Sequence, residues 1–104
     1  MQFDVYKNDN PTSREHFPYL LDLQADLLAE LESCIVVPLA PEAAFANKVL
    51  QGVMPLVRVK GKRYSAVMPQ LAAIARRALG VKVTNLREFR ADFTAAVDLL
   101  FTGV

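Results

Sequence analysis

Residues 85–101 read NLREFRADFTAAVDLLF and carry the clearest structural signal in the chain. Apolar side chains recur in this segment at steps of three and four residues, which is the spacing of one face of an α-helix. They are Leu86, Phe89, Phe93, Ala96, Val97, Leu100 and Phe101. Asn85, followed three residues later by Glu88, is typical of a helix N-terminus. We therefore predict an amphipathic helix that ends near Phe101, followed by a short free tail over residues 102–104.

The segments before this helix show the patterns of β-strands. Met1, Phe3 and Val5 alternate with polar residues, so we predict a half-buried strand that starts at the first residue. Residues 34–37 form a largely β-branched run that suits a buried strand. We expect Pro38 to close that strand at a sheet edge.

Residues 56–67 indicate a β-hairpin, because two short strand-like runs flank a turn around Gly61. Four basic side chains surround this turn, namely Arg58, Lys60, Lys62 and Arg63. We interpret them as solvated charges that keep a sheet edge from aggregating, with contact to phosphate as the alternative.

Two segments are ambiguous between helix and strand. In residues 19–32, leucines fall at helical spacing but also alternate with polar residues, and intrinsic propensity favours a helix. Residues 69–79 are Ala-rich between a proline and Gly80, which again suggests a helix. The remaining connections are a polar loop over residues 7–15, which we expect to be mobile, and a short helical excursion within residues 41–51.

Composition limits the class of protein. The chain has 104 residues, of which 53% are hydrophobic, so we expect one domain over residues 1–104 that folds without disulfides or metals. With 12 Lys and Arg against 11 Asp and Glu, the net charge is +1, which disfavours nucleic acid as the main partner. One Cys and one His exclude an internal disulfide and a Cys/His zinc site. No apolar run approaches about 20 residues, and no signal-peptide pattern is present, so we expect a cytoplasmic protein without a membrane partner.

Few residues suggest catalytic chemistry. His16 is the only imidazole in the sequence, and in a polar loop it is expected to be solvated. Cys34 opens the β-branched run, so we interpret it as a small buried apolar residue rather than a reactive thiol. Asp22, Gln24 and Asp26 would share one strand face, which we expect to face solvent. The chain has no phosphate-binding glycine loop, paired-His motif or calcium loop, so we expect no cofactor and no metal, and these patterns favour an α+β binding domain over an enzyme.

Four blocks of sequence carry a resemblance when they are taken together. They are MQFDVY at residues 1–6, LDLQADLL at residues 21–28, VVPL at residues 36–39, and the terminal helix with its ending FTGV at residues 101–104. In order, spacing and total length they resemble the CcdB-type toxins of plasmid and chromosomal toxin–antitoxin modules. The coincidence of the blocks, rather than any one of them, is specific to that family.

The resemblance implies an α+β fold, a small SH3-like antiparallel β-barrel with a C-terminal α-helix, assembled as a homodimer. This fold makes residues 20–25 and much of residues 74–83 extended. We adopt that expectation over local helix propensity because non-local sheet pairing often prevails.

The resemblance also implies a function. Members of the family bind the dimerisation region of the DNA gyrase A subunit and trap gyrase on cleaved DNA, until a partly disordered antitoxin removes them. The chain is therefore expected to be a non-enzymatic toxin whose partners are the gyrase A subunit, a cognate antitoxin and a second copy of itself. The gyrase-binding residues that the resemblance implies are Leu27, Leu28, Asp98, Phe101, Thr102, Gly103 and Val104. Gly103 and Val104 match the family's tail, whereas Thr102 stands where the family has a bulky aromatic residue.

Two other functions are compatible with the same barrel. One is a ribonuclease toxin that cuts messenger RNA, for which His16, Arg14 and Glu15 would supply a base, a cation and an acid around one phosphate. The other is a non-toxic relic that only binds an antitoxin.

Overall fold

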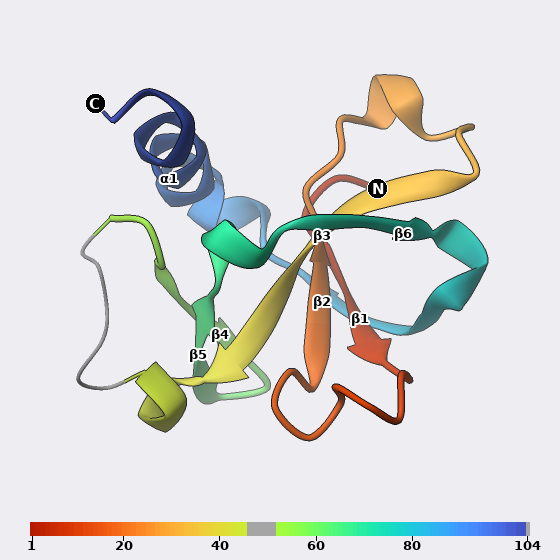
Figure 1. The fold of residues 1–104 in the computed structure, drawn as a ribbon, viewed down its shortest axis with the longest axis horizontal. Coiled ribbons are helices and arrows are strands. Elements are labelled where there is room, and N and C mark those ends of the chain that lie inside the picture. Colours follow the sequence, from red (N-terminus) through yellow and green to blue (C-terminus); the bar gives the residue numbers. More distant parts are fainter. Residues whose placement is uncertain (46–51, 104) are drawn as a thin grey trace.

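A computed structural model describes residues 1–45 and 52–103 of the chain. Within these residues, one antiparallel sheet is followed by a C-terminal helix (Figure 1). The elements are β1 (Asp4–Asn8), β2 (Tyr19–Asp22), β3 (Ser33–Pro41), β4 (Leu56–Val59), β5 (Lys62–Ala66), β6 (Ala72–Ala75), β7 (Leu79–Asn85) and α1 (Arg90–Thr102). The strand order is β4-β5-β3-β2-β1-β7, with β6 paired to β3. The sheet curls into a half-barrel, and the predicted α+β fold, a small antiparallel barrel with a C-terminal helix, is confirmed.

The sheet and one face of α1 enclose the hydrophobic core. Its centre is Phe93, which is fully buried and stacks on Phe3 with ring centroids 5.6 Å apart. Side chains of the first three strands pack around this pair, including Val5, Leu21 and Leu39. Each such side chain stabilises the fold by about 1.5–3 kcal/mol when it leaves water. Phe93 and Ala96 are therefore the buried side chains through which α1 joins the core.

The predicted C-terminal helix is present, with differences at both ends. A 3-10 turn, η5 (Arg87–Phe89), precedes α1, and Asn85 Oδ1 accepts the N–H of Arg87 at 2.9 Å. The prediction of Asn85 as the helix cap is wrong, because the N-cap residues are Leu86 for this turn and Phe89 for α1, and Asn85 bonds only the first N–H of the turn. At the other end, the prediction that Thr102 belongs to a free tail is wrong, because Thr102 is the last residue of α1 and its hydroxyl donates to the Asp98 carbonyl at 2.6 Å.

The predicted strand from the first residue begins later than expected. Residues 1–3 form a turn, which the Asp4 N–H closes on the Met1 carbonyl at 3.0 Å. Phe3 has a φ of 69°, a left-handed conformation that bulky residues rarely adopt. Its backbone bonds to β2 and to Leu86, together with the stacking on Phe93, hold it there. The turn directs the chain start toward the β2–β3 connection.

The strand that was expected to end at Pro38 continues to Pro41. The reason is a change of partner along β3, which pairs with β6 over residues 33–36 and with β5 over residues 39–41. Pro38 lies between the stretch of β3 that pairs with β6 and the stretch that pairs with β5. No strand pairs with it on that side, so the N–H that proline lacks is not needed for a hydrogen bond between strands. Its carbonyl still accepts the N–H of Val67 at 3.0 Å.

The helix interpretation is wrong for both ambiguous segments, which hold short strands and 3-10 turns instead of an α-helix. The extended state that the resemblance implied for residues 20–25 is found in residues 20–22, and that for residues 74–83 is found on both sides of a 3-10 turn. The first contains β2 and a 3-10 turn, η1 (Asp26–Leu28). The second contains η3 (Met68–Gln70), β6, η4 (Arg76–Ala78) and the start of β7. Pairing of β2 with β1 and β3, and of β6 with β3, overrides the local propensity for helix.

The predicted hairpin is confirmed as β4 and β5. Lys60 and Gly61 at its turn have φ values of 51° and 79°, the two positive values that a tight two-residue hairpin turn requires. β4, which carries Arg58, is an outer strand of the sheet, whereas Arg63 lies on the inner strand β5 and forms an ion pair with Glu42, so the interpretation as solvated edge charges does not extend to Arg63. Part of the predicted excursion after Pro41 is η2 (Glu42–Phe45), and the rest lies outside the described residues. Among the described residues, no helix is long and apolar enough to cross a membrane.

Candidate partner-binding site

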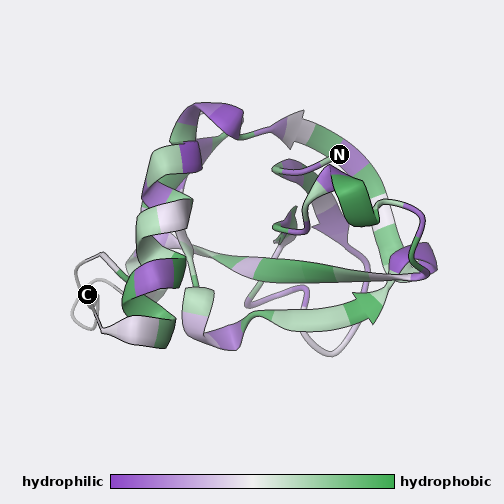
Figure 2. Ribbon diagram, turned by 90° about the horizontal axis from the view of Figure 1, so that it is seen from above, coloured by the Kyte–Doolittle hydropathy of each residue, from purple (hydrophilic) through white to green (hydrophobic). Residues whose placement is uncertain are grey.

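The connection between β2 and β3 exposes three leucines, which we call the leucine tip. Leu27, Leu28 and Leu31 are 93%, 45% and 50% exposed. Leu27 and Leu28 form the hydrophobic turn η1, which Figure 2 shows beside the N-terminus. A cluster of exposed leucines on a short loop is typical of a surface that a partner covers. Acidic side chains at Asp26, Glu30 and Glu32 accompany the tip.

The buried side-chain amide of Gln24 joins the two ends of the loop that carries the tip, at a place that we call the neck of the loop. Gln24 is 8% exposed, and its Nε2 donates to the carbonyls of Leu28 at 3.0 Å and Ser33 at 3.2 Å. Its Oε1 accepts the N–H of Ile35 at 3.2 Å, and its own N–H donates to Asp22 Oδ1 at 2.9 Å. Each such bond contributes about 0.5–1.5 kcal/mol net. The expectation that Asp22 and Gln24 face solvent is therefore wrong, and of the three polar residues only Asp26 does so.

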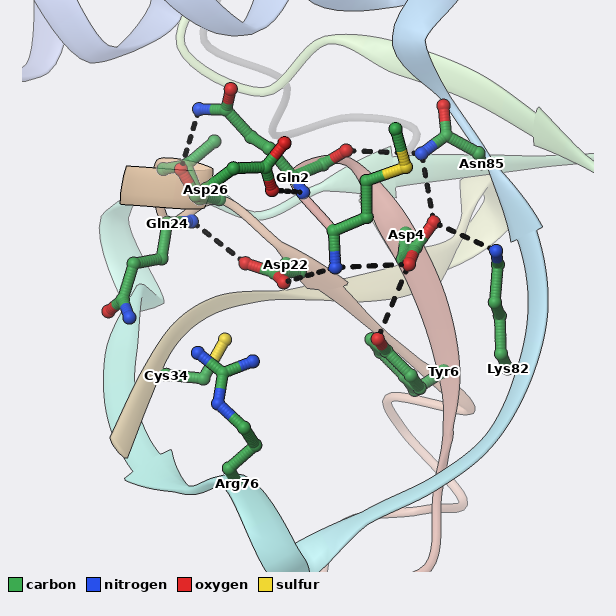
Figure 3. Close-up of polar contacts among 12 residues, drawn as sticks. Gln2, Asp4, Tyr6, Asp22, Gln24, Asp26, Cys34, Arg76, Lys82 and Asn85 are labelled. Carbon is green, nitrogen blue, oxygen red and sulfur yellow. Dashed lines mark hydrogen bonds and ion pairs between the residues drawn. The ribbon is translucent and has the colours of Figure 1, made fainter. Parts of the chain in front are cut away.

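The chain start also holds this loop, as Figure 3 shows. The N–H of Gln2 donates to Asp26 Oδ1 at 2.7 Å, and its Nε2 donates to the Leu23 carbonyl at 3.1 Å. The Gln2 carbonyl in turn accepts a bond from Asn85 Nδ2 at 3.1 Å. Residue 2 thus links the end of β7 to the first residue of η1.

Arg76 forms hydrogen bonds to the C-terminal part of the same loop. Its backbone N–H donates to the Glu32 carbonyl at 2.7 Å, and its Nε donates to the Leu31 carbonyl at 3.1 Å. The loop is therefore bonded to η4 as well as to Gln2 and Gln24.

Two buried carboxylates lie beneath the loop. Asp4 and Asp22 are 3% and 2% exposed, and the ammonium of Met1 lies 3.2 Å from Asp4 Oδ2 and 3.7 Å from Asp22 Oδ2. Lys82 Nζ, at 3.3 Å, and Asn85 Nδ2, at 2.9 Å, both contact Asp4 Oδ1. Burial raises the pKa of Asp4, but the Asn85 bond and the nearby cations outweigh it and hold the pKa below its usual value.

The C-terminal half of α1 supplies the other predicted residues. Asp98, Thr102 and Gly103 are exposed, and Phe101 is 70% exposed. Gly103 ends the helix in a left-handed conformation with φ 75°, and its N–H donates to the Leu99 carbonyl at 3.0 Å. Val104 lies outside the described residues.

A depression of about 250 Å³ lies between the start of the loop that carries the leucine tip and α1. Gln2, Phe3 and Leu23 line one side, and Phe93, Thr94, Val97 and Asp98 line the other. Asp98 therefore faces the base of the loop that bears Leu27 and Leu28, while Phe101 lies almost one turn further along α1. In Figure 1, the tip loop and the end of α1 lie at the same end of the molecule, on opposite sides of it.

The remaining candidates offer little chemistry. Burial raises the pKa of the Cys34 thiol to about 11, assisted by the neighbouring carboxylate of Asp22, and the thiol is fully buried, as predicted. His16 is exposed and, with Glu15, lines an open depression of about 440 Å³ that Arg14 does not line. Within residues 1–45 and 52–103, no cluster of three or more His, Cys, Asp and Glu side chains could hold a metal ion.

Sequence reasoning named Leu27 and Leu28 but not the exposed Leu31, and it gave no structural role to Gln2 or Gln24. The alternation of Asp22 and Gln24 with leucines marked one shared face, but nothing in that pattern shows that the face is covered. A comparison with protein-family models places residues 2–103 in the family described as CcdB protein.

Proposed function

The chain belongs to the CcdB family of toxin–antitoxin toxins, and on this premise we propose that it binds the A subunit of DNA gyrase and traps gyrase on cleaved DNA. A cognate antitoxin neutralises it by removing it from gyrase. In this proposal the chain performs no catalysis of its own, and it converts gyrase into the agent of DNA damage.

The observation that carries the proposal is the exposure of large apolar side chains at positions for which the family resemblance implies contact with gyrase. Leu27 is 93% exposed and Phe101 is 70% exposed, although both belong to ordered elements. A side chain of this size contributes about 1.5–3 kcal/mol when it is fully buried. Buried anchors of this kind carry most of the affinity of a protein interface.

The helix end supports the same proposal. Gly103 adopts a positive φ, and in the part of the chain that the structure describes no atom beyond its chain neighbours lies within 4 Å of the position that its Cβ would occupy. The glycine is therefore suited to let a partner approach the backbone closely rather than to pack against its own fold. Residues 101–103 would present an aromatic ring, a hydroxyl and this exposed turn to gyrase.

The first test is to incubate the purified protein with DNA gyrase and supercoiled plasmid. We expect linear, gyrase-cleaved DNA to accumulate after the protein is stripped away, and supercoiling to be inhibited. Normal supercoiling without cleaved DNA, at concentrations well above that of gyrase, would contradict the proposal.

A ribonuclease is the second candidate, since His16 and Glu15 line one depression. Labelled RNA should therefore be assayed in parallel with gyrase. We expect it to remain intact, whereas specific cleavage that His16→Ala abolishes would favour the ribonuclease. Antitoxin binding without either activity would indicate the non-toxic relic.

We also propose that the protein acts as a homodimer with a two-fold, self-complementary interface. Sedimentation at micromolar concentration should give about twice the chain mass of 11.5 kDa. A monomer at that concentration would contradict this part of the proposal.

A further inference from the structure

The core gives the leucine tip little packing, because Leu27 is 93% exposed and Leu28 and Leu31 are 45% and 50% exposed, so the tip relies on hydrogen bonds for its shape. We infer that Gln24, together with the Asp26 carboxylate that accepts the Gln2 N–H, positions the tip for binding to gyrase. Neither contact needs to touch the partner. The inference rests on the proposed function and adds positioning residues to it.

The Gln24 side chain makes three hydrogen bonds. All three connect to the two sides of the tip loop, which are η1 and the start of β3. Its Nε2 reaches Leu28 on η1 and Ser33 at the start of β3, at 3.0 and 3.2 Å, and its Oε1 accepts from Ile35 at 3.2 Å. One side chain thus ties η1 to β3 across the neck of the loop. Because Gln24 is 8% exposed, water has little access to replace these bonds.

The Asp26 contact fixes the opposite side of η1. Asp26 is the first residue of η1, and its Oδ1 accepts the Gln2 N–H at 2.7 Å. Gln2 is itself held by Asn85 and by its bond to the Leu23 carbonyl. Leu27 and Leu28 therefore stand between two anchors, Asp26 before them and the Gln24–Leu28 bond after them.

Loss of an anchor should reduce the fraction of molecules whose tip has the binding geometry. The apparent dissociation constant rises in inverse proportion to that fraction. If Gln24→Met leaves about one molecule in ten with an ordered tip, binding to the gyrase A subunit weakens about 10-fold.

A matched control exists at the end of β1, where the chain enters the loop to β2. Asn8 is also 8% exposed, its Nδ2 donates to Ser13 Oγ at 3.0 Å and to the Phe17 carbonyl at 2.8 Å, and its Oδ1 accepts the Asn10 N–H at 3.0 Å. Asn8→Leu therefore removes two donated bonds and one accepted bond, the same set as Gln24→Met. We expect Asn8→Leu to leave gyrase binding within about twofold of wild type.

The decisive measurement is a double-mutant cycle with Leu27→Ala, with binding to the gyrase A subunit measured by calorimetry. If Gln24 acts through the tip, Gln24→Met should weaken binding much less in the Leu27→Ala background than in wild type. Equal losses in both backgrounds, or a loss in Asn8→Leu as large as in Gln24→Met, would overturn the inference.

A second pair of variants keeps the test decisive if Gln24→Met does not fold. Asp26 is exposed, so Asp26→Ala and Asp26→Asn should both fold. Asp26→Ala should weaken binding several-fold, and Asp26→Asn should restore it because an amide oxygen still accepts the Gln2 N–H. Full binding by Asp26→Ala, or failure of Asp26→Asn to restore it, would overturn the positioning role. If Leu27→Ala weakens binding but Gln24→Met and Asp26→Ala do not, the inference alone is overturned. If Leu27→Ala leaves binding unchanged, the proposed contact site is overturned as well.

Discussion

The tip loop and the end of α1 present their apolar groups to solvent by different means. The loop that carries Leu27 and Leu28 is bonded to residues distant in sequence, namely Gln2 and Arg76, and Gln24 bonds it to the start of β3. Phe101 is instead carried by a helix whose last bonds are all local. The Thr102 hydroxyl and the Gly103 N–H both bond to carbonyls four residues earlier. Changes far from the tip should therefore alter it, while the helix end should respond only to changes in α1 itself.

The largest effect should come from Phe93→Ala, which removes the contact that α1 shares with the chain start. Phe93 is fully buried and stacks on Phe3, so the loss of free energy of unfolding should be about 3–5 kcal/mol. Urea denaturation measures it, with the exposed neighbour Thr94→Ala as a control that should change stability by less than about 0.5 kcal/mol. A loss below about 1 kcal/mol in Phe93→Ala would show that α1 is not anchored in this way.

Asp4→Ala should have the next largest effect, and it should act on the tip side of the molecule. The substitution leaves Asn85 Nδ2 without one of its two partners and removes the carboxylate that Lys82 and the Met1 ammonium share. We expect a loss of about 1–3 kcal/mol, because both cations are themselves half exposed. Hydrogen exchange should show greater opening of residues 25–32 and unchanged exchange in the last turn of α1.

The same carboxylate predicts how stability depends on pH. Its folded pKa lies below the ordinary value of 3.8, so its contribution is complete above that value and is lost as pH falls through the folded pKa. The wild type should therefore lose more free energy of unfolding between pH 5 and pH 2 than Asp4→Asn does. Parallel curves for the two proteins would contradict this assignment.

A smaller effect is expected from Gly103→Val, which tests the helix end alone. A valine at φ 75° costs about 1–2 kcal/mol of local strain, although the space around the position is open. Unwinding of the last residues can relieve that strain, so the global loss should stay below this value. Gyrase poisoning should fall strongly, and hydrogen exchange in the tip loop should not change.

The smallest effect on stability should come from deletion of residues 103–104. Gly103 contributes one N–H bond to the end of α1, so the free energy of unfolding should change by less than about 0.5 kcal/mol. Poisoning of gyrase should nevertheless be abolished, and binding of the antitoxin should largely survive. Full potency of the truncated protein would remove the tail from the contact site.

The elements that could be predicted from sequence are those whose signal is local. The apolar stripe around Phe93 specified α1, and Lys60 and Gly61 lie at the turn of the predicted hairpin. The extended state of β2 and β6 required the family resemblance, because their pairing partners are distant in sequence and local propensity favoured a helix.

Other features left no local signal. Phe3 is a bulky residue in a left-handed conformation, which its residue type argues against. Pro38 lies within β3 only because the neighbouring strand changes there. The burial of Gln24 depends on residues up to eleven positions away in sequence. Leu27 and Phe101, which the resemblance names as gyrase-binding residues, are exposed, and their role in binding stays a prediction.

The buried Cys34 thiol makes the native protein convenient for site-directed labelling. Its full burial and its pKa of about 11 leave it almost entirely protonated and shielded from maleimides near neutral pH. A cysteine introduced in place of Thr102 could therefore carry a fluorophore without removal of the natural thiol. Conversely, alkylation of Cys34 would require the sheet to open. The rate of alkylation would therefore report how often the protein unfolds and how far bound antitoxin slows that unfolding.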